Sequence, residues 1–325
     1  MRLLRAVRRR CPSTRLEPYR TAAQPQAHPE PHASFAGPRQ ALDWLRAEYP
    51  ALLAIVRSDR VPGHVAYQLV GSLWPHWNSF GIGEEARAAH RIGLTAARGA
   101  RDRAAIGRML VNTGLTELAT DPRHALGLLF EAKEHYAAAG APRNAASTIH
   151  HLALAHEALG REDHAEALWW RAVAECRHEG EERTSALALT ALAQRANNTE
   201  RYSEGAALAS TAYDTLILNS PAPDQHGAAL AQTQWARAEA GAGNDDRARD
   251  LLNAAIETLS GLGASLPCGK ALMQLAAVHI ATGRVPQALD CYHFGAHLAR
   301  DRGDMDGLVS IQRALDAIPR HQPTA

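Results

Sequence analysis

The stretch HEALGREDHAEALWW, residues 156–170, joins the end of one predicted helix to the start of another. Gly160 lies where a residue in the left-handed conformation ends a helix, and alanines follow the polar turn after it. The pattern returns downstream, because a shift of 40 residues carries Ala153 onto Ala193 and a shift of 83 carries it onto Ala236. A period of this size marks a supersecondary unit stacked on its own copies. The sequence therefore predicts an array of helical hairpins.

Small residues recur at equivalent places in both helices of each copy. They are Ala153, Ala193, Ala236 and Ala276 in the first helices, and Ala165, Gly205, Ala248 and Ala288 in the second helices. Small side chains let two helix axes approach closely. Large apolar residues follow four positions later on the same face of the second helix, as in Trp169, Leu252 and Tyr292. One hairpin cannot bury this stripe alone, so we expect the copies to stack.

This hairpin pattern of small and then aromatic residues resembles the tetratricopeptide repeat, over roughly residues 60–300. The 40-residue period is similar to that of the long-helix form found in bacterial regulators. The resemblance implies an all-α fold, an α-solenoid of about six hairpins with a preceding helix and a C-terminal capping helix. We expect a disordered basic, proline-rich arm, an N-terminal capping helix, the repeats, a C-terminal capping helix and a disordered tail. Their boundaries are 1–37, 38–58, 59–301, 302–318 and 319–325.

Two further stretches resemble one group of repeat proteins. The first is FAGPRQALDWLRAEYPALLAIV, residues 35–56, through Trp44, Leu45, Glu48, Pro50, Leu52 and Val56. The second is YQLVGSLWPHW, residues 67–77, through Leu73, Trp74, Pro75 and Trp77. Both are similar to the start of the repeat array in actinobacterial regulators of antibiotic biosynthesis. Those regulators carry a DNA-binding winged helix, an activation module and a STAND-type ATPase before the array. The resemblance covers none of these upstream domains, so it implies a stand-alone or truncated relative without their DNA-binding or ATPase activity.

Composition and charge narrow the possible functions. The chain has 325 residues and a formal net charge of +1, so no global field attracts nucleic acid or a membrane. The cysteines are scattered with no Cys-x-x-Cys spacing, which favours reduced thiols. No apolar run is long enough to span a bilayer, and the start MRLLRAVRRRCPSTR lacks the apolar segment of a signal peptide. We therefore expect a cytoplasmic protein with no membrane partner.

The first 20 residues have a charge pattern unlike the rest. They contain seven arginines and one acid, Glu17. An arginine run of this kind can bind nucleic acid electrostatically. A DNA-associated regulator that uses this arm is therefore the alternative function, and a solvated arm or the remnant of a lost domain is the simpler interpretation.

Three candidate chemistries fail on their spacing or placement. In GLGASLPCGKA, residues 261–271, Ala264 and Ala271 replace the glycine and the hydroxyl residue that a phosphate-binding loop needs. Asp290, His293 and His297 have metal-ligand spacing, but we expect them on an outward face with no second helix to complete a site. No Gly-x-Ser-x-Gly turn is present. We therefore predict no enzyme, no cofactor and no metal.

The remaining hypothesis is a binding surface. In a stacked array the first helices line the concave side, where their non-core residues form a groove for a peptide or protein partner. The predicted groove residues are Arg108, Leu115, Ser147, His150, Glu157, Thr190, Gln194, Asn197, Asn198, Thr233, Arg237 and Lys270. Amides such as those of Asn197 and Asn198 can pair with the backbone of an extended peptide. Any solvated helix face also carries such residues, so an ordinary surface is the competing interpretation.

Overall fold

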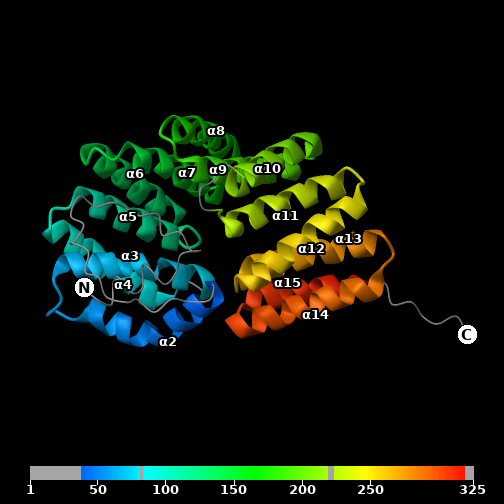
Figure 1. Ribbon diagram of the computed structural model, residues 1–325, viewed down its shortest axis with the longest axis horizontal. Helices are drawn as coiled ribbons and strands as arrows, with labels where there is room; N and C mark the ends of the chain where they lie inside the picture. The colour runs from blue at the N-terminus through cyan, green and yellow to red at the C-terminus, as the bar shows by residue number, and fades with distance from the viewer. Residues whose placement is uncertain (1–37, 81–82, 219–222, 319–325) are drawn as a thin grey trace, which may run out of the picture. The chain divides into compact units, whose positions relative to one another are not determined.

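The computed structural model describes residues 38–80, 83–218 and 223–318, which form fourteen helices and no strand. Within the described residues, successive helices pair as hairpins, and these hairpins confirm the predicted all-α repeat array (Figure 1). The N-terminal arm and the C-terminal tail predicted from the sequence lie outside the described residues.

The described chain divides into two compact units, which are treated separately below. Unit 1 runs to Leu192 and also includes Thr215–Asp224, whereas unit 2 comprises Ala193–Asp214 and the residues from Gln225 onward. The helices that begin in unit 1 are α2 (Pro38–Arg57), α3 (Gly63–Phe80), α4 (Glu84–Gly99), α5 (Arg103–Glu117), α6 (Pro122–Ala138), α7 (Pro142–Ala158), α8 (Glu162–His178) and α9 (Glu182–Asn198). Those that begin in unit 2 are α10 (Tyr202–Ile217), α11 (Gln225–Gly241), α12 (Asp245–Gly261), α13 (Ser265–Ala281), α14 (Val285–Arg302) and α15 (Met305–Asp316).

The helix ends repeat one backbone pattern. Gly160 has a φ of +69°, and the next amide, Arg161 N–H, donates to the His156 carbonyl at 2.9 Å. A hydrogen bond that spans six residues around a left-handed glycine ends a helix and satisfies one of its last carbonyls. Gly243 and Gly283 repeat this geometry in later copies. Glycine is favoured here because a side chain strains the left-handed conformation, although Glu200 takes the same conformation in the copy after that of Gly160, with a φ of +58°.

The small residues predicted for the hairpin crossings form the core. Ala153, Ala165, Ala248 and Ala288 have no exposed surface, and Trp169, four residues after Ala165, is also buried. The same close approach is visible at Gly107 of α5, where an added Cβ would lie 3.0 Å from the Tyr136 ring of α6. The sequence repeat therefore predicted where the helices of a hairpin pack together, because a small residue at that place lets the two helices approach closely.

The N-terminal helix differs from expectation in one respect. The sequence predicts an interruption at Pro50, but α2 continues through it. Proline removes one backbone hydrogen bond from a helix interior, and the buried face of α2 offsets that cost because Leu45, Leu52 and Val56 pack into the core. Trp77 of α3 is buried beside this helix, and its indole N–H donates to the Tyr49 hydroxyl at 3.1 Å.

The C-terminal helix α15 packs against α14, where an added Cβ on Gly295 would lie 3.4 Å from Ile311. Ile311 is buried, as predicted for the capping face. Met305, by contrast, is 66% exposed. It is the first residue of the helix, beyond the part that α14 covers.

The two helices of a hairpin lie on different sides of unit 1. The first helices of successive hairpins contact one another directly, α3 with α5 and α5 with α7. The second helices α6 and α8 both pack on α7 and make no comparably extensive contact with each other. The first helices therefore form an inner face, and a gap floored by α7 separates α6 from α8.

Candidate functional site

The structure buries several of the residues predicted for a concave groove. Arg108, His150, Asn197 and Thr233 are all buried, so their side chains offer almost no surface to a ligand. The other predicted residues keep some exposure. Leu115, Ser147, Glu157, Thr190 and Arg237 are half-buried, and Gln194, Asn198 and Lys270 are exposed. For these residues a binding role stays a prediction.

Asn197 needs a specific correction because it was expected to bind the backbone of a peptide. Its side chain is only 2% exposed, and its amide donates to the Gln234 carbonyl of α11 at 2.9 Å. The backbone that it bonds is that of α11 in this chain, whereas the expectation was a peptide backbone. Asn197 therefore joins α9 to α11 within unit 2 and is not part of an open groove.

On the inner face of unit 1, polar side chains from α7 and α9 meet. The hydroxyl oxygens of Ser147 and Thr184 lie 3.2 Å apart. The Arg183 guanidinium donates to the Asp224 carboxylate at 2.6 Å, and that carboxylate side chain is only 7% exposed. We call Ser147, His150, His151, Arg183 and Thr184 the inner-face cluster.

The two histidines of the inner-face cluster are uncharged at neutral pH. Burial, with smaller contributions from the neighbouring His151 and Arg183, lowers the pKa of His150 to about 3. Burial and Arg183 likewise lower the pKa of His151 to about 4. The two ring centroids lie 5.5 Å apart, and neither Nδ1 atom has a hydrogen-bond partner although both atoms are buried. A buried polar atom without a partner costs free energy in the folded state.

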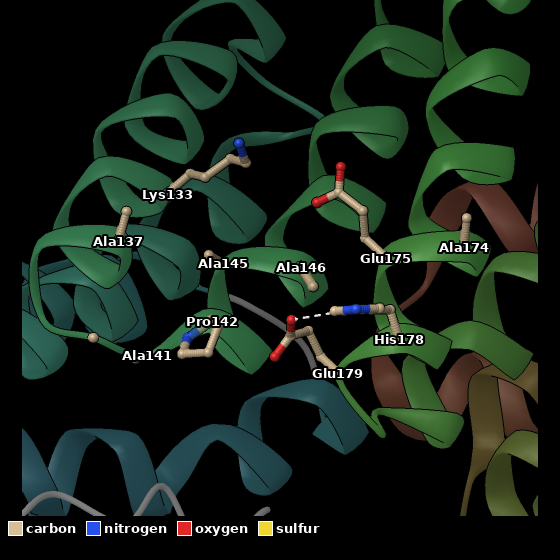
Figure 2. Close-up of a pocket in the computed structure, with 11 residues that line it drawn as sticks. Lys133, Ala137, Ala141, Pro142, Ala145, Ala146, Ala174, Glu175, His178 and Glu179 are labelled. Atoms are coloured by element: carbon tan, nitrogen blue, oxygen red, sulfur yellow. Dashed lines mark hydrogen bonds and ion pairs between the residues drawn. The ribbon is translucent and has the colours of Figure 1, made fainter.

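A second candidate site lies on the opposite side of α7 and was not predicted from the sequence. Two neighbouring pockets of about 590 Å³ each occupy the gap between α6 and α8, and both are lined by Lys133 and Ala137. We call these two pockets together the outer groove. Figure 2 shows the first of them, with Lys133 and Glu175 on opposite walls and Ala145 and Ala146 between them.

The two pockets of the outer groove differ in lining. The first pocket has small residues at its floor, Ala145 and Ala146, and the rim residues His178 and Glu179, whose side chains interact at 3.1 Å. The second has the larger Ile149 and Leu152 at its floor. Its wall includes Phe130, which is 51% exposed. A large exposed aromatic side chain beside a pocket is typical of a binding surface. Nothing in the sequence indicated this pocket, because Phe130 stands in a predicted helix with no motif around it.

No arrangement in the described residues indicates a metal centre. No group of three His, Cys, Asp or Glu side chains there is placed to hold a metal ion. His297 lies 3.6 Å from Asp301 on the same exposed face of α14. Across the described helices, none is long and apolar enough to cross a membrane.

Comparisons with known proteins agree on the class of fold. No known protein-family profile and no curated protein matches the sequence. The structural neighbours are helical-repeat proteins of the tetratricopeptide type. The Rap protein solved in complex with competence and sporulation factor superposes with a TM-score of 0.61 at 10% identity, covering 86% of this chain and 82% of that one.

Two further neighbours have a TM-score of 0.54 at 12% identity. One is aspartyl phosphate phosphatase F from Bacillus subtilis, with coverage of 85% of this chain and 74% of that chain. The other is a signal transduction ATPase with numerous domains (STAND) that has a tetratricopeptide-repeat sensor, from Pyrococcus horikoshii. The match covers 84% of this chain but 42% of that protein. At these identities the likeness shows the fold alone.

Proposed function

We propose that this chain is a non-enzymatic interaction module of bacterial regulation that binds a peptide or a peptide segment of a protein. The observation that carries the proposal is the inner-face cluster, where the half-buried side chains of Ser147, His151 and Thr184 gather on α7 and α9, with the hydroxyl oxygens of Ser147 and Thr184 3.2 Å apart. Neutral imidazoles can each donate one hydrogen bond and accept another. A peptide backbone presents both kinds of group, so it can satisfy this site whatever its side chains are.

The comparisons support a regulatory role without fixing its pathway. The Rap neighbour was solved with competence and sporulation factor bound, and the STAND neighbour carries its repeats as a sensor. The stretches around Trp44 and Trp74 resemble the start of the array in biosynthetic regulators. Our finer proposal is therefore a stand-alone or truncated relative of such a regulator, acting in the cytoplasm.

A peptide selection tests the proposal. Peptides from a random display library would be selected on the full chain, and their affinities measured by calorimetry. We expect His151→Ala to weaken the selected peptides about tenfold, which corresponds to ~1.4 kcal/mol. His293→Ala is the matched control, because His293 lies exposed on α14 of unit 2. Equal affinity for both variants and the unaltered chain would remove the inner-face cluster from the proposal.

The arginine-rich arm supports a second candidate, a DNA-associated regulator. Its seven arginines could neutralise several phosphates, which makes binding strongly salt-dependent. A titration of the full chain with duplex DNA tests this candidate. It requires that the affinity for DNA falls steeply as the salt concentration rises and that DNA binding is lost when residues 1–20 are deleted. Binding that survives the deletion would exclude the arm as its source.

A further inference from the structure

The outer groove lies on the side of α7 opposite the inner-face cluster. Its two pockets follow one another along α7, with Ala145 at the floor of the first and Leu152 at the floor of the second. These floor residues are seven positions apart on one helix, which places them about 10 Å apart along its axis. On a partner helix that runs parallel to α7, the same distance separates residues i and i+7.

The groove walls leave room for a helix. Ala137 of α6 and Ala167 and Ala174 of α8 are exposed, small and directed into the pockets. Small side chains on both walls let a third helix settle between α6 and α8, in the way that an amphipathic helix lies in an apolar groove. Phe130 extends the apolar surface at the end of the second pocket.

The charged side chains that line the groove indicate which residues a partner should carry. Arg171 interacts with Glu175 and His178 with Glu179, so both acids of the first pocket already have partners. Lys133 lines both pockets, and among the described residues no carboxylate forms an ion pair with its ammonium group. An acidic side chain between the two anchors of a partner would meet Lys133.

Glu134 completes the charge pattern. It is exposed on the wall of the second pocket, and it too has no cationic partner among the described side chains. It lies on the same helix as Lys133 and belongs to the second pocket alone. A basic residue of the partner near Phe130 would therefore suit it, whereas the acidic residue belongs at the junction of the pockets.

From this geometry we propose that the outer groove binds an amphipathic helix of another protein, with apolar residues one heptad apart and an acidic residue between them. The two apolar residues enter the two pockets, and the acid pairs with Lys133. The pair is partly shielded by the groove walls, so it contributes more to the choice of partner than a fully exposed ion pair does.

A helix selection with matched variants tests this. Helical peptides randomised on one face would be selected on the full chain, and their affinities measured for Ala174→Leu, Ala167→Leu and Lys133→Glu. The leucines fill one pocket each at exposed positions, so the fold should be preserved. We expect the selected peptides to carry the apolar–acidic–apolar pattern and to lose at least about tenfold in affinity, ~1.4 kcal/mol, for each variant.

Two control variants alter exposed residues of unit 2, away from the groove. Ala254→Leu matches the added bulk, and Arg313→Glu matches the reversed charge. Both should leave affinity unchanged, as should His151→Ala on the inner face. Replacing the acid of the peptide with lysine should restore binding to Lys133→Glu, because the ion pair is then rebuilt with its signs exchanged.

Several results would overturn the proposal. They are the absence of any selected helix, selected helices whose affinity is the same for all groove variants, or failure of the exchanged charges to restore binding. Sedimentation of the full chain adds a further outcome. A dimer that dissociates on Ala174→Leu would make a second copy of this chain the occupant of the groove.

Discussion

At the scale of single residues, Asn197 and Gly205 depend on each other. A Cβ added to Gly205 would lie 2.2 Å from the Asn197 Oδ1 atom. Asn197 cannot move aside at little cost, because its amide is bonded to the Gln234 carbonyl of α11. Gly205 is therefore small so that a polar link between helices fits beside it.

This dependence predicts opposite effects for two similar substitutions. Gly205→Ala should lower the free energy of unfolding by about 1–3 kcal/mol, as overpacking does. Gly127→Ala in α6 should raise it by about 0.5–1 kcal/mol, because nothing lies within 4 Å of its added Cβ and alanine favours the helix. Urea unfolding of both variants measures the difference, and stabilisation by Gly205→Ala would show that Asn197 is mobile.

Buried histidines predict how stability responds to acid. The pKa values of His150 and His151 fall to about 3 and about 4 in the folded chain, compared with 6.5 for free histidine. As the pH falls below about 6.5 the unfolded chain binds protons that the folded chain does not. The stability that these two histidines contribute is therefore complete above that pH and is lost progressively as the pH falls to about 3.

Denaturant unfolding across this pH range tests the two histidines. His150→Gln should flatten the pH dependence of the unfolding free energy, because one of the groups with a lowered pKa is gone. His293→Gln serves as the control, since His293 is exposed. An unchanged slope for His150→Gln would mean that His150 is not desolvated in the folded state.

At the scale of elements, one buried acid fixes the turn between α11 and α12. The Glu239 carboxylate accepts hydrogen bonds from the Trp235 indole at 2.9 Å and from the Asn244 amide at 2.8 Å. It also pairs with Arg247 at 3.1 Å, and the guanidinium of Arg247 lies 5.1 Å from the centroid of the Trp235 ring. These contacts connect the end of one helix to the start of the next.

Glu239→Gln should therefore destabilise the protein by about 1–3 kcal/mol, because a neutral amide accepts these hydrogen bonds less well and can orient its own donor toward Asn244. Thermal or urea unfolding measures the loss. Arg247→Gln removes only the exposed cation and should cost less than about 1 kcal/mol. If both variants lose the same stability, the ion pair and not the buried acid determines the strength of the turn.

At the scale of the whole molecule, the sequence predicted the parts that repeat. The alanines and glycines at fixed spacing located the hairpins, because the two helices of every copy approach each other closely at these small residues. The continuous α2 was missed because the penalty for Pro50 is local, whereas the compensating burial of Leu45 and Leu52 involves residues distant in sequence. The outer groove was missed for a related reason. Phe130 of α6 and Ala167 of α8 line one pocket only when two hairpins stack.

The capping helix predicts a consequence for the end of the array. Deleting the residues after Arg302 removes α15 and uncovers the surface of α14 that Ile311 buries. We expect a lower melting temperature and self-association at high concentration, since an uncapped array exposes its apolar edge. Calorimetry and sedimentation measure both. A truncated chain as stable and as monomeric as the full chain would show that α15 is not a cap.

The central claim is that the inner face of unit 1 binds a peptide. Hydrogen exchange measured by mass spectrometry, with and without a peptide selected on the full chain, tests it most directly. We predict slower exchange in α7 and in the part of α9 up to Leu192, together with unchanged exchange in α14 and α15. Protection confined to other helices, or none at saturating peptide, would contradict the account.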